Sequence, residues 1–254
     1  MKRAAVVVIL LAGLTVGIQA AIRGDVKVLE ATDTIRYRIN DFTKSYLLYY
    51  LFPQKIFLKE RLAEDLRQLD ESFREISVTT EDAKTKNLLA YFAYEKTHLI
   101  ELLEKKPEKK DLAELLLMSE TFSEGADTIA RHHAYNFSEN EKMFMRTRSM
   151  RQGIEEILKY YIARMVLSDD PQIQKKLDRS IKRFNEKLAV IDRYTYSEEK
   201  VLRARERIDV SWRLAEKYLT KKKEKSPVPL VLNVGGEHIE SFLNVLGIYH
   251  SKSQ

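Results

Sequence analysis

The chain has 254 residues, of which 44% are hydrophobic and 32% charged, and its formal net charge is +6. This composition is typical of long amphipathic helices, and so small an excess of positive charge gives no reason to expect a nucleic-acid partner. Cysteine is absent, which excludes disulfides, thiolate metal sites and a cysteine nucleophile.

Residues 1–21 predict export from the cytoplasm. Lys2 and Arg3 are followed by an apolar run, residues 4–18, and then by small residues, which is the layout of a secretory signal peptide. Cleavage after Ala20 would leave Ile18 at the −3 position, which is less usual than alanine. An uncleaved N-terminal membrane anchor is therefore the alternative, because a stretch of about 19 apolar residues just spans a bilayer. In either case we expect the chain to be periplasmic or anchored to the outer face of the inner membrane, with membrane contact only through this segment.

Scarcity of glycine and proline predicts an all-α fold. Between Asp25 and Ser226 there are two glycines and three prolines, and both residue types are costly inside helices. The expected helices cover residues 24–51, 55–76, 80–105, 109–137, 138–167, 171–192, 196–224 and 236–250. Lys221 to Gly236, with a basic run, two prolines and a glycine pair, is expected to form a loop.

A heptad seam runs through the middle of the chain. Its positions follow a strict 3,4 alternation from Leu112 to Tyr161, apolar at both ends and polar around His133. Ser138 followed by Glu141 has the pattern of a capping box. Two helices are therefore expected to meet near residue 138.

An internal repeat divides the chain at the same place. A shift of 111 residues matches mostly apolar or aromatic positions, which predicts two repeated four-helix-bundle-like units, residues 22–137 and 138–254, joined by a long helix. The matched pairs are Ile39 with Met150, Leu47 with Leu158, Tyr49 with Tyr160, Tyr50 with Tyr161, Leu62 with Ile173, Leu66 with Leu177, and Phe73 with Phe184.

Motifs for catalysis and cofactors are not found. A di-iron bundle requires two Glu-x-x-His motifs, and Glu95 with His98 supplies one. His132 and His133 are adjacent on a helix and point about 100° apart, so they cannot hold one metal alone. Neither a glycine-rich phosphate loop nor a nucleophile elbow is present. We therefore expect no metal, no cofactor and no catalytic residue, and a protein that is not an enzyme.

The candidate ligand-binding residues lie near the start of two helices. They are Arg36, Arg38, Arg146, Arg148 and Gln152. A guanidinium group can bind an oxyanion through two parallel hydrogen bonds, and a symmetric pair across a dimer interface would double this contact. These residues predict recognition of a small anion. The alternative is that they lie on solvated faces or form ion pairs between helices.

The stretch from Arg146 to Ile154 resembles a known family. Its sequence, Arg-Thr-Arg-Ser-Met-Arg-Gln-Gly-Ile, is similar to the hallmark helix of the extracytoplasmic N-terminal module of type IV pilus methyl-accepting chemotaxis transducers, the PilJ type. That module is related to the sensor region of nitrate-responsive histidine kinases. Gly153 replaces the closing arginine of the pattern. Trp212 and residues 228–249 resemble the tail of stand-alone members.

The first half of the chain resembles the same helix more distantly. Arg36 and residues 43–48 carry the similarity, and Asp41 stands at the second arginine position. The resemblance implies an extracytoplasmic sensor or binding module, in which arginines of this helix hold a small anion at a dimer interface. Without an effector domain, such a module would signal through a protein partner or as a homodimer. A structural or interaction scaffold of the cell envelope, with no small-molecule ligand, is the alternative.

Overall fold

The described part of the chain folds into helices joined by short turns, which confirms the predicted all-α class. The computed structural model describes residues 2–133, 136–220 and 228–252, with side chains from Gly24 onward, and contains no strand in these ranges. The helices are α1 (Lys2–Leu51), α2 (Ile56–Thr79), α3 (Ala83–Glu104), α4 (Lys109–His132), α5 (Glu139–Val166), α6 (Pro171–Arg193), α7 (Glu199–Leu219) and α8 (Val228–Lys252).

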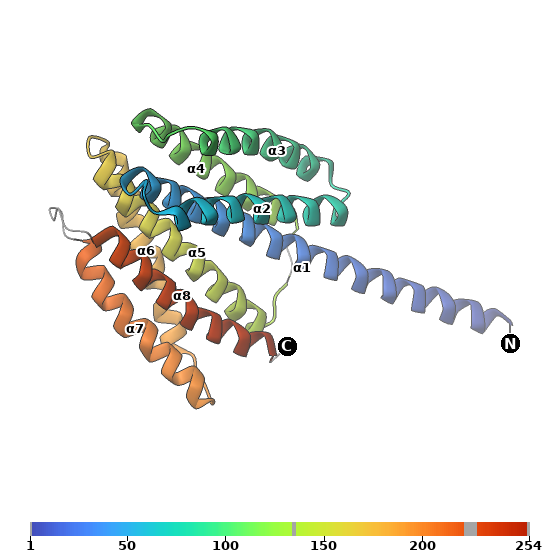
Figure 1. Cartoon of the computed structure of the whole chain (residues 1–254). Helices are drawn as coiled ribbons and strands as arrows, with labels where there is room; N and C mark the ends of the chain where they lie inside the picture. Colours follow the sequence, from blue (N-terminus) through green and yellow to red (C-terminus); the bar gives the residue numbers. More distant parts are fainter. Residues whose placement is uncertain (1, 134–135, 221–227, 253–254) are drawn as a thin grey trace.

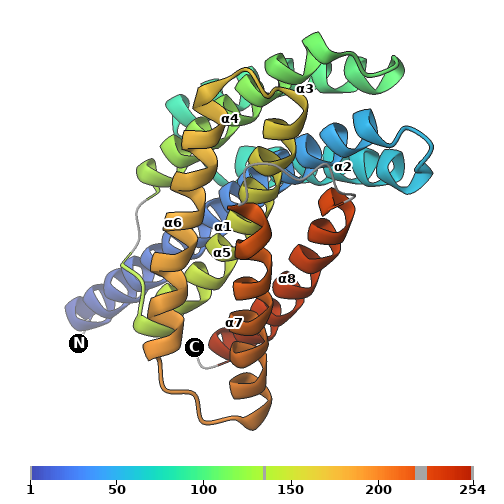
Figure 2. The ribbon, with the colours of Figure 1, turned by 90° about the vertical axis from the view of Figure 1, so that its left-hand side faces the viewer.

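Two long helices, α1 and α5, lie at the centre of the molecule and pack against each other. Helices α2, α3 and α4 lie together on one side of this pair, and α6, α7 and α8 lie together on the other (Figure 1). Figure 2, a view turned by 90°, shows the same arrangement of the helices. The N-terminal part of α1 projects beyond the other helices (Figure 1).

The helix expected to join the two units is interrupted, so this part of the prediction is wrong. Helix α4 ends at His132 and α5 begins at Glu139. The capping box predicted here is confirmed: the Glu141 amide donates to the Ser138 hydroxyl over 3.2 Å, and the Ser138 amide donates to the Glu141 carboxylate over 2.7 Å. These two bonds satisfy amide groups that the first turn of a helix leaves free, and they fix the start of α5.

One connected core of buried side chains runs through both halves of the chain. Among α1–α4 the rings of Phe73, Phe92 and Phe122 stack with centroids 4.8–6.2 Å apart. Among α5–α8 Phe184 packs against Trp212 at 4.2 Å, and the indole Nε1 donates to Asn185 over 2.6 Å. Aromatic pairs at such distances stabilise the fold beyond the area they bury.

The order of neighbouring helices is the same in both halves. Helix α1 packs against α2 and α4, and α5 packs against α6 and α8. The repeat itself, and a domain boundary near residue 138, stay predictions.

The last helix is longer than expected, and the loop predicted for residues 221–236 is wrong over residues 228–236, while residues 221–227 lie outside the described residues. Helix α8 begins at Val228, with Pro229 in its first turn, where a missing amide hydrogen costs nothing. A Cβ added to Gly236 would lie 2.7 Å from Leu158 Cδ1 and 3.0 Å from Ile154 Cγ2. This glycine therefore lets α8 approach α5 closely and does not mark a turn.

The predicted signal peptide or membrane anchor lies within the helical backbone of α1, but the side chains of residues 1–21 lie outside the described residues. Within residues 24–133, 136–220 and 229–252, no helix has an apolar stretch long enough to cross a bilayer. Export and periplasmic location stay predictions.

Candidate functional site

The five candidate residues lie in three places. Arg38 and Arg148 line one cavity, and Arg36 and Gln152 line a second. Arg146 lines neither of them, and its Nη1 lies 3.3 Å from the Met143 sulfur.

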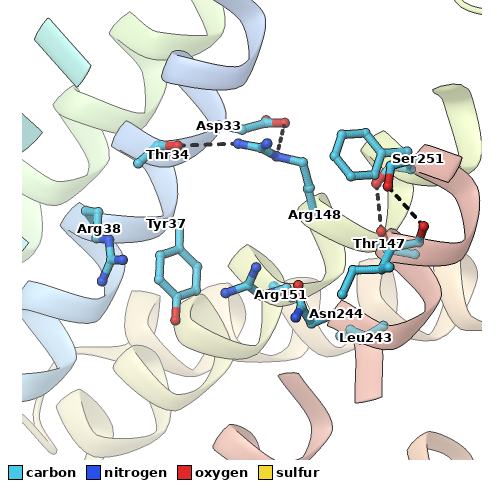
Figure 3. Close-up of a pocket in the computed structure, with 13 residues that line it drawn as sticks. Asp33, Thr34, Tyr37, Arg38, Thr147, Arg148, Arg151, Leu243, Asn244 and Ser251 are labelled. Atoms are coloured by element: carbon cyan, nitrogen blue, oxygen red, sulfur yellow. Dashed lines mark hydrogen bonds and ion pairs between the residues drawn. The ribbon is translucent and has the colours of Figure 1, made fainter. Parts of the chain in front are cut away.

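The first cavity, which we call the arginine cavity, has a volume of about 270 Å³ and lies between α1, α5 and α8 (Figure 3). Its volume suits only a small ligand, since pockets for drug-sized molecules begin at about 300 Å³. The polar lining residues are Asp33, Thr34, Tyr37, Arg38, Thr147, Arg148, Arg151, Asn244 and Ser251.

Helical spacing explains why these side chains share a cavity. Thr34 and Arg38 are four residues apart on α1, and Arg148 and Arg151 are three residues apart on α5, so each pair lies on one face of its helix. Gly247 of α8 lies against α5, where an added Cβ would be 3.1 Å from the Thr147 hydroxyl. Because Gly247 has no side chain, α8 can approach α5 closely and complete the cavity formed by α1 and α5.

The ring of Tyr37 lies between Arg38 and Arg151 (Figure 3). The two guanidinium carbons lie 5.1 Å and 5.2 Å from the ring centroid, within the range of cation–π attraction. The Tyr37 hydroxyl donates to Glu240 Oε2 over 2.7 Å. Tyr37 thus orients two of the three arginines of the cavity.

The three arginines differ in how fully their donors are used. Arg148 donates to the Glu30 carbonyl oxygen over 2.8 Å and to the Thr34 hydroxyl over 3.3 Å. Arg38 reaches Asp65 at 3.1 Å. The Nε atoms of Arg38 and Arg151 are buried and have no hydrogen-bond partner among the described residues. A guanidinium group has five N–H donors, so the wall of this cavity retains donors for a ligand.

A network of buried charges lies behind the cavity. Lys44 is fully buried, and its Nζ lies 3.0 Å from Asp41 and 2.5 Å from Glu155. Arg61 of α2 reaches Asp41 at 2.9 Å and Glu237 of α8 at 2.5 Å. Burial disfavours the charged amine of Lys44, but attraction by Asp41 and Glu155 raises its pKa above the usual value.

Two carboxyl groups of this network have raised pKa values. Burial, followed by the nearby charge of Asp41, raises the pKa of Asp65 to about 8. Burial and the nearby Glu155 carboxylate raise the pKa of Glu240 well above its usual value. Asp65 and Glu240 are also the carboxyl groups that face Arg38 and Arg151.

The second cavity, of about 340 Å³, lies beside α5 and α6 and holds Arg36 and Gln152. Arg36 donates to the carboxylates of both Asp33 and Asp127, so its charge is compensated within the protein. Arg183 pairs with Glu156 at 2.7 Å.

The two cavities differ in the balance of their lining charges. In the second cavity three basic side chains face three acidic ones: Arg36, Arg183 and Lys187 against Asp33, Asp127 and Glu156. The lining of the arginine cavity holds three arginines and one carboxylate, that of Asp33, because the other acidic partners of these arginines, Glu30, Asp65 and Glu240, are not lining residues. The arginine cavity is therefore the better anion site.

The histidines form no metal centre with their acidic neighbours. His98 lies 3.7 Å from Glu95, and His133 lies 2.8 Å from Asp25 on a different part of the molecule. Within residues 24–133, 136–220 and 229–252, no three histidine, aspartate or glutamate side chains are grouped to hold a metal ion.

Arg151, Tyr37 and Glu240 belong to the site and were not predicted. Arg151 stands three residues after Arg148, and this same-face spacing was the signal that could have identified it. Tyr37 and Glu240 carried no such signal, because their place depends on how α8 packs against α1 and α5.

Comparison of the chain with protein-family models, with curated proteins and with solved structures gives no match. The fold and the site therefore define the protein only as an all-α helical module with an arginine-lined cavity. The resemblance to PilJ-type modules stays a prediction.

Proposed function

We propose that this protein is an extracytoplasmic helical module that binds a small anion in the arginine cavity. The observation that carries the proposal is the convergence of Arg38, Arg148 and Arg151 on one cavity. Charge-assisted hydrogen bonds from guanidinium groups to an oxyanion are stronger than neutral ones.

The position of the cavity fits a sensor that acts through another protein. Its lining comes from α1, α5 and α8, so a bound anion contacts three helices and stabilises their packing. We propose that this change is passed to a protein partner or to a second copy of the chain. The resemblance of residues 146–154 to PilJ-type modules supports signal transduction of this kind, and the N-terminal segment supports a place outside the cytoplasm.

A thermal-shift screen of the full chain tests the proposal. The ligands are nitrate, nitrite, sulfate, phosphate, formate and acetate at millimolar concentration, and the variants are Arg148→Gln and Arg151→Gln. Arg203→Gln is the matched control, because Arg203 is exposed on α7 and pairs with Glu199 one turn away. Each protein is compared with its own ligand-free form, so a general loss of stability does not affect the result.

We expect at least one anion to raise the melting temperature of the wild type and the control, and to have little effect on the two cavity variants. If no anion shifts the wild type, or if the cavity variants respond as the control does, the proposal fails.

One observation favours the alternative of an interaction scaffold. Val210, Leu214 and Tyr218 follow one another at four-residue spacing on α7 and are 64%, 58% and 38% exposed. Such a stripe is typical of a helix face that contacts another protein. Crosslinking in intact cells, comparing the wild type with Leu214→Glu, tests this function. A crosslinked partner lost in the variant supports it, and identical crosslinks in both proteins reject it.

A further inference from the structure

Two arginines of the cavity are each backed by a buried carboxyl group. Asp65 of α2 is fully buried and lies 3.1 Å from Arg38 Nη1. Glu240 of α8 is 7% exposed and lies 4.0 Å from Arg151 Nε. Each guanidinium group therefore stands between the cavity and an internal carboxyl group.

Both carboxyl groups have one oxygen without a donor. Asp65 Oδ2 and Glu240 Oε1 are buried and accept no hydrogen bond from a donor among the described residues, and the Glu240 carboxyl lies within hydrogen-bond reach of Glu155. An ionised carboxylate in that state is costly, because burial removes the water that would otherwise solvate it. A proton on each group removes this cost.

The charged and titratable neighbours of the two groups lie on α1, α2 and α5. Asp65 faces Arg38 and Asp41 of α1 and Arg61 of its own helix. Glu240 faces Tyr37 and Lys44 of α1, and Glu155 and Arg151 of α5. Each carboxyl thus has a like charge beside it, Asp41 in one case and Glu155 in the other, which favours the protonated form near neutral pH.

We infer that the arginine cavity takes up its anion together with protons, which Asp65 and Glu240 accept. The inference rests on the proposed function. An anion bound to Arg38 and Arg151 brings a negative charge close to both carboxyl groups, and like charges repel strongly where water is excluded. The bound anion therefore favours protonation of Asp65 and Glu240.

The same coupling acts in the opposite direction. A neutral carboxyl group leaves the charge of its arginine available to the ligand, so protonation strengthens anion binding by the same factor by which binding favours protonation. Affinity therefore rises as the pH falls from alkaline values towards neutral, and one site couples anion binding to protonation.

Calorimetric titration of the full chain with nitrate and with sulfate tests the inference, because both anions stay unprotonated between pH 7 and pH 9.5. One proton taken up per bound anion weakens binding by up to about tenfold for each unit of rising pH. Below the pKa of Asp65, about 8, the free protein already holds these protons, so the dissociation constant should change little there, and above it the constant should rise by about threefold to tenfold per unit. At pH 9, in two buffers of different ionisation enthalpy, the apparent binding heats should differ by the amount that net proton uptake requires.

Two isosteric variants locate the protons, and each is informative alone if the other does not fold. Glu240→Gln keeps an acceptor for Tyr37, and Asp65→Asn keeps an acceptor for Arg38. Each should bind the anion more tightly than the wild type at pH 8 and take up fewer protons. Glu120→Gln is the control, because Glu120 bonds Tyr160 and Lys176 away from the arginine cavity, and it should keep the wild-type pH dependence.

The outcomes separate the inference from the proposed function. Anion binding that depends on Arg151 but has the same affinity at pH 7 and pH 9.5, without proton uptake at pH 9, overturns the coupling and leaves the binding function standing. Absence of binding of either anion at every pH overturns both.

Discussion

Lys44 of α1 and Glu155 of α5 form an ion pair of 2.5 Å in the core, where the two central helices meet. Their positions differ by the same 111 residues as the sequence repeat. A twofold relation between two copies of one unit would bring such equivalent positions face to face, and this pair agrees with the predicted repeat. The pair also joins the two halves of the chain behind the arginine cavity.

Removal of the lysine from this pair should strongly destabilise the fold. Lys44→Met leaves the carboxylates of Asp41 and Glu155 buried with less compensation, which costs about 3–5 kcal/mol. Urea unfolding at pH 7 measures the loss. Lys142→Met is the control, because Lys142 pairs with Glu139 at the surface, where a pair contributes about 0–1 kcal/mol. Equal unfolding midpoints for the two variants would contradict the account.

Asp65→Asn should change how stability depends on pH. The pKa of Asp65 is about 8 in the folded protein against 3.8 ordinarily, so the folded state holds its proton more strongly than the unfolded state. This contribution to stability is fully present below pH 3.8 and is lost as the pH rises towards 8, by up to about 1.4 kcal/mol per pH unit.

Asparagine carries no charge, so the free energy of unfolding of the variant, relative to that of the wild type, should increase from pH 5 to pH 8. Urea unfolding at these two pH values measures the difference. Wild-type and variant stabilities that change in parallel would show that Asp65 does not titrate in this range.

Lys159→Met should show a pH dependence of its own. Lys159 is buried and donates to the Ser119 hydroxyl over 3.0 Å, and burial lowers its pKa from 10.5 to about 8. The folded state therefore disfavours the charged amine, and stability is lost as the pH falls from 10.5 towards 8. Methionine removes this cost, so the stability of the variant relative to that of the wild type should be higher at pH 7 than at pH 10. Thermal unfolding at both pH values measures it, and a constant difference would contradict the prediction.

Alanine substitutions at two adjacent glycines of α8 should change the stability of the fold in opposite directions. Gly236→Ala forces a Cβ to within 2.7 Å of Leu158, and overpacking of this kind costs about 1–3 kcal/mol. Gly235 has no atom within 4 Å of an added Cβ, so Gly235→Ala should stabilise the helix by about 0.5–1 kcal/mol. Denaturant midpoints of the two variants test the pair. A stabilising Gly236→Ala would show that α8 does not approach α5 as described.

The sequence predicted most helix ends because local chemistry sets them. Ser138 and Glu141 cap α5 through contacts within four residues, which a sequence pattern reveals. The start of α8 was predicted wrongly because Gly235 and Gly236 were interpreted by their local preference for turns. Gly236 instead serves the packing of α8 on α5, and a contact between distant segments leaves no local pattern.

The residues of the candidate site could also be predicted only in part from the sequence. Helical spacing and residue type identified Arg38 and Arg148, which do share a cavity. Arg36 is of the same type, but Asp33 and Asp127 compensate its charge. Asp127 lies on α4, far from Arg36 in the sequence, so this compensation could not be foreseen.

Calorimetric titration of the wild type, Arg151→Gln and Arg203→Gln with nitrate, sulfate and formate at pH 6 tests the central claim most directly. We predict saturable binding of one anion per chain in the wild type and in Arg203→Gln, with affinity reduced by about tenfold or more in Arg151→Gln, since a hydrogen bond to a charged group contributes about 1.5–3 kcal/mol. Absence of saturable binding of any of these anions to the wild type, or equal affinity in all three proteins, would contradict it.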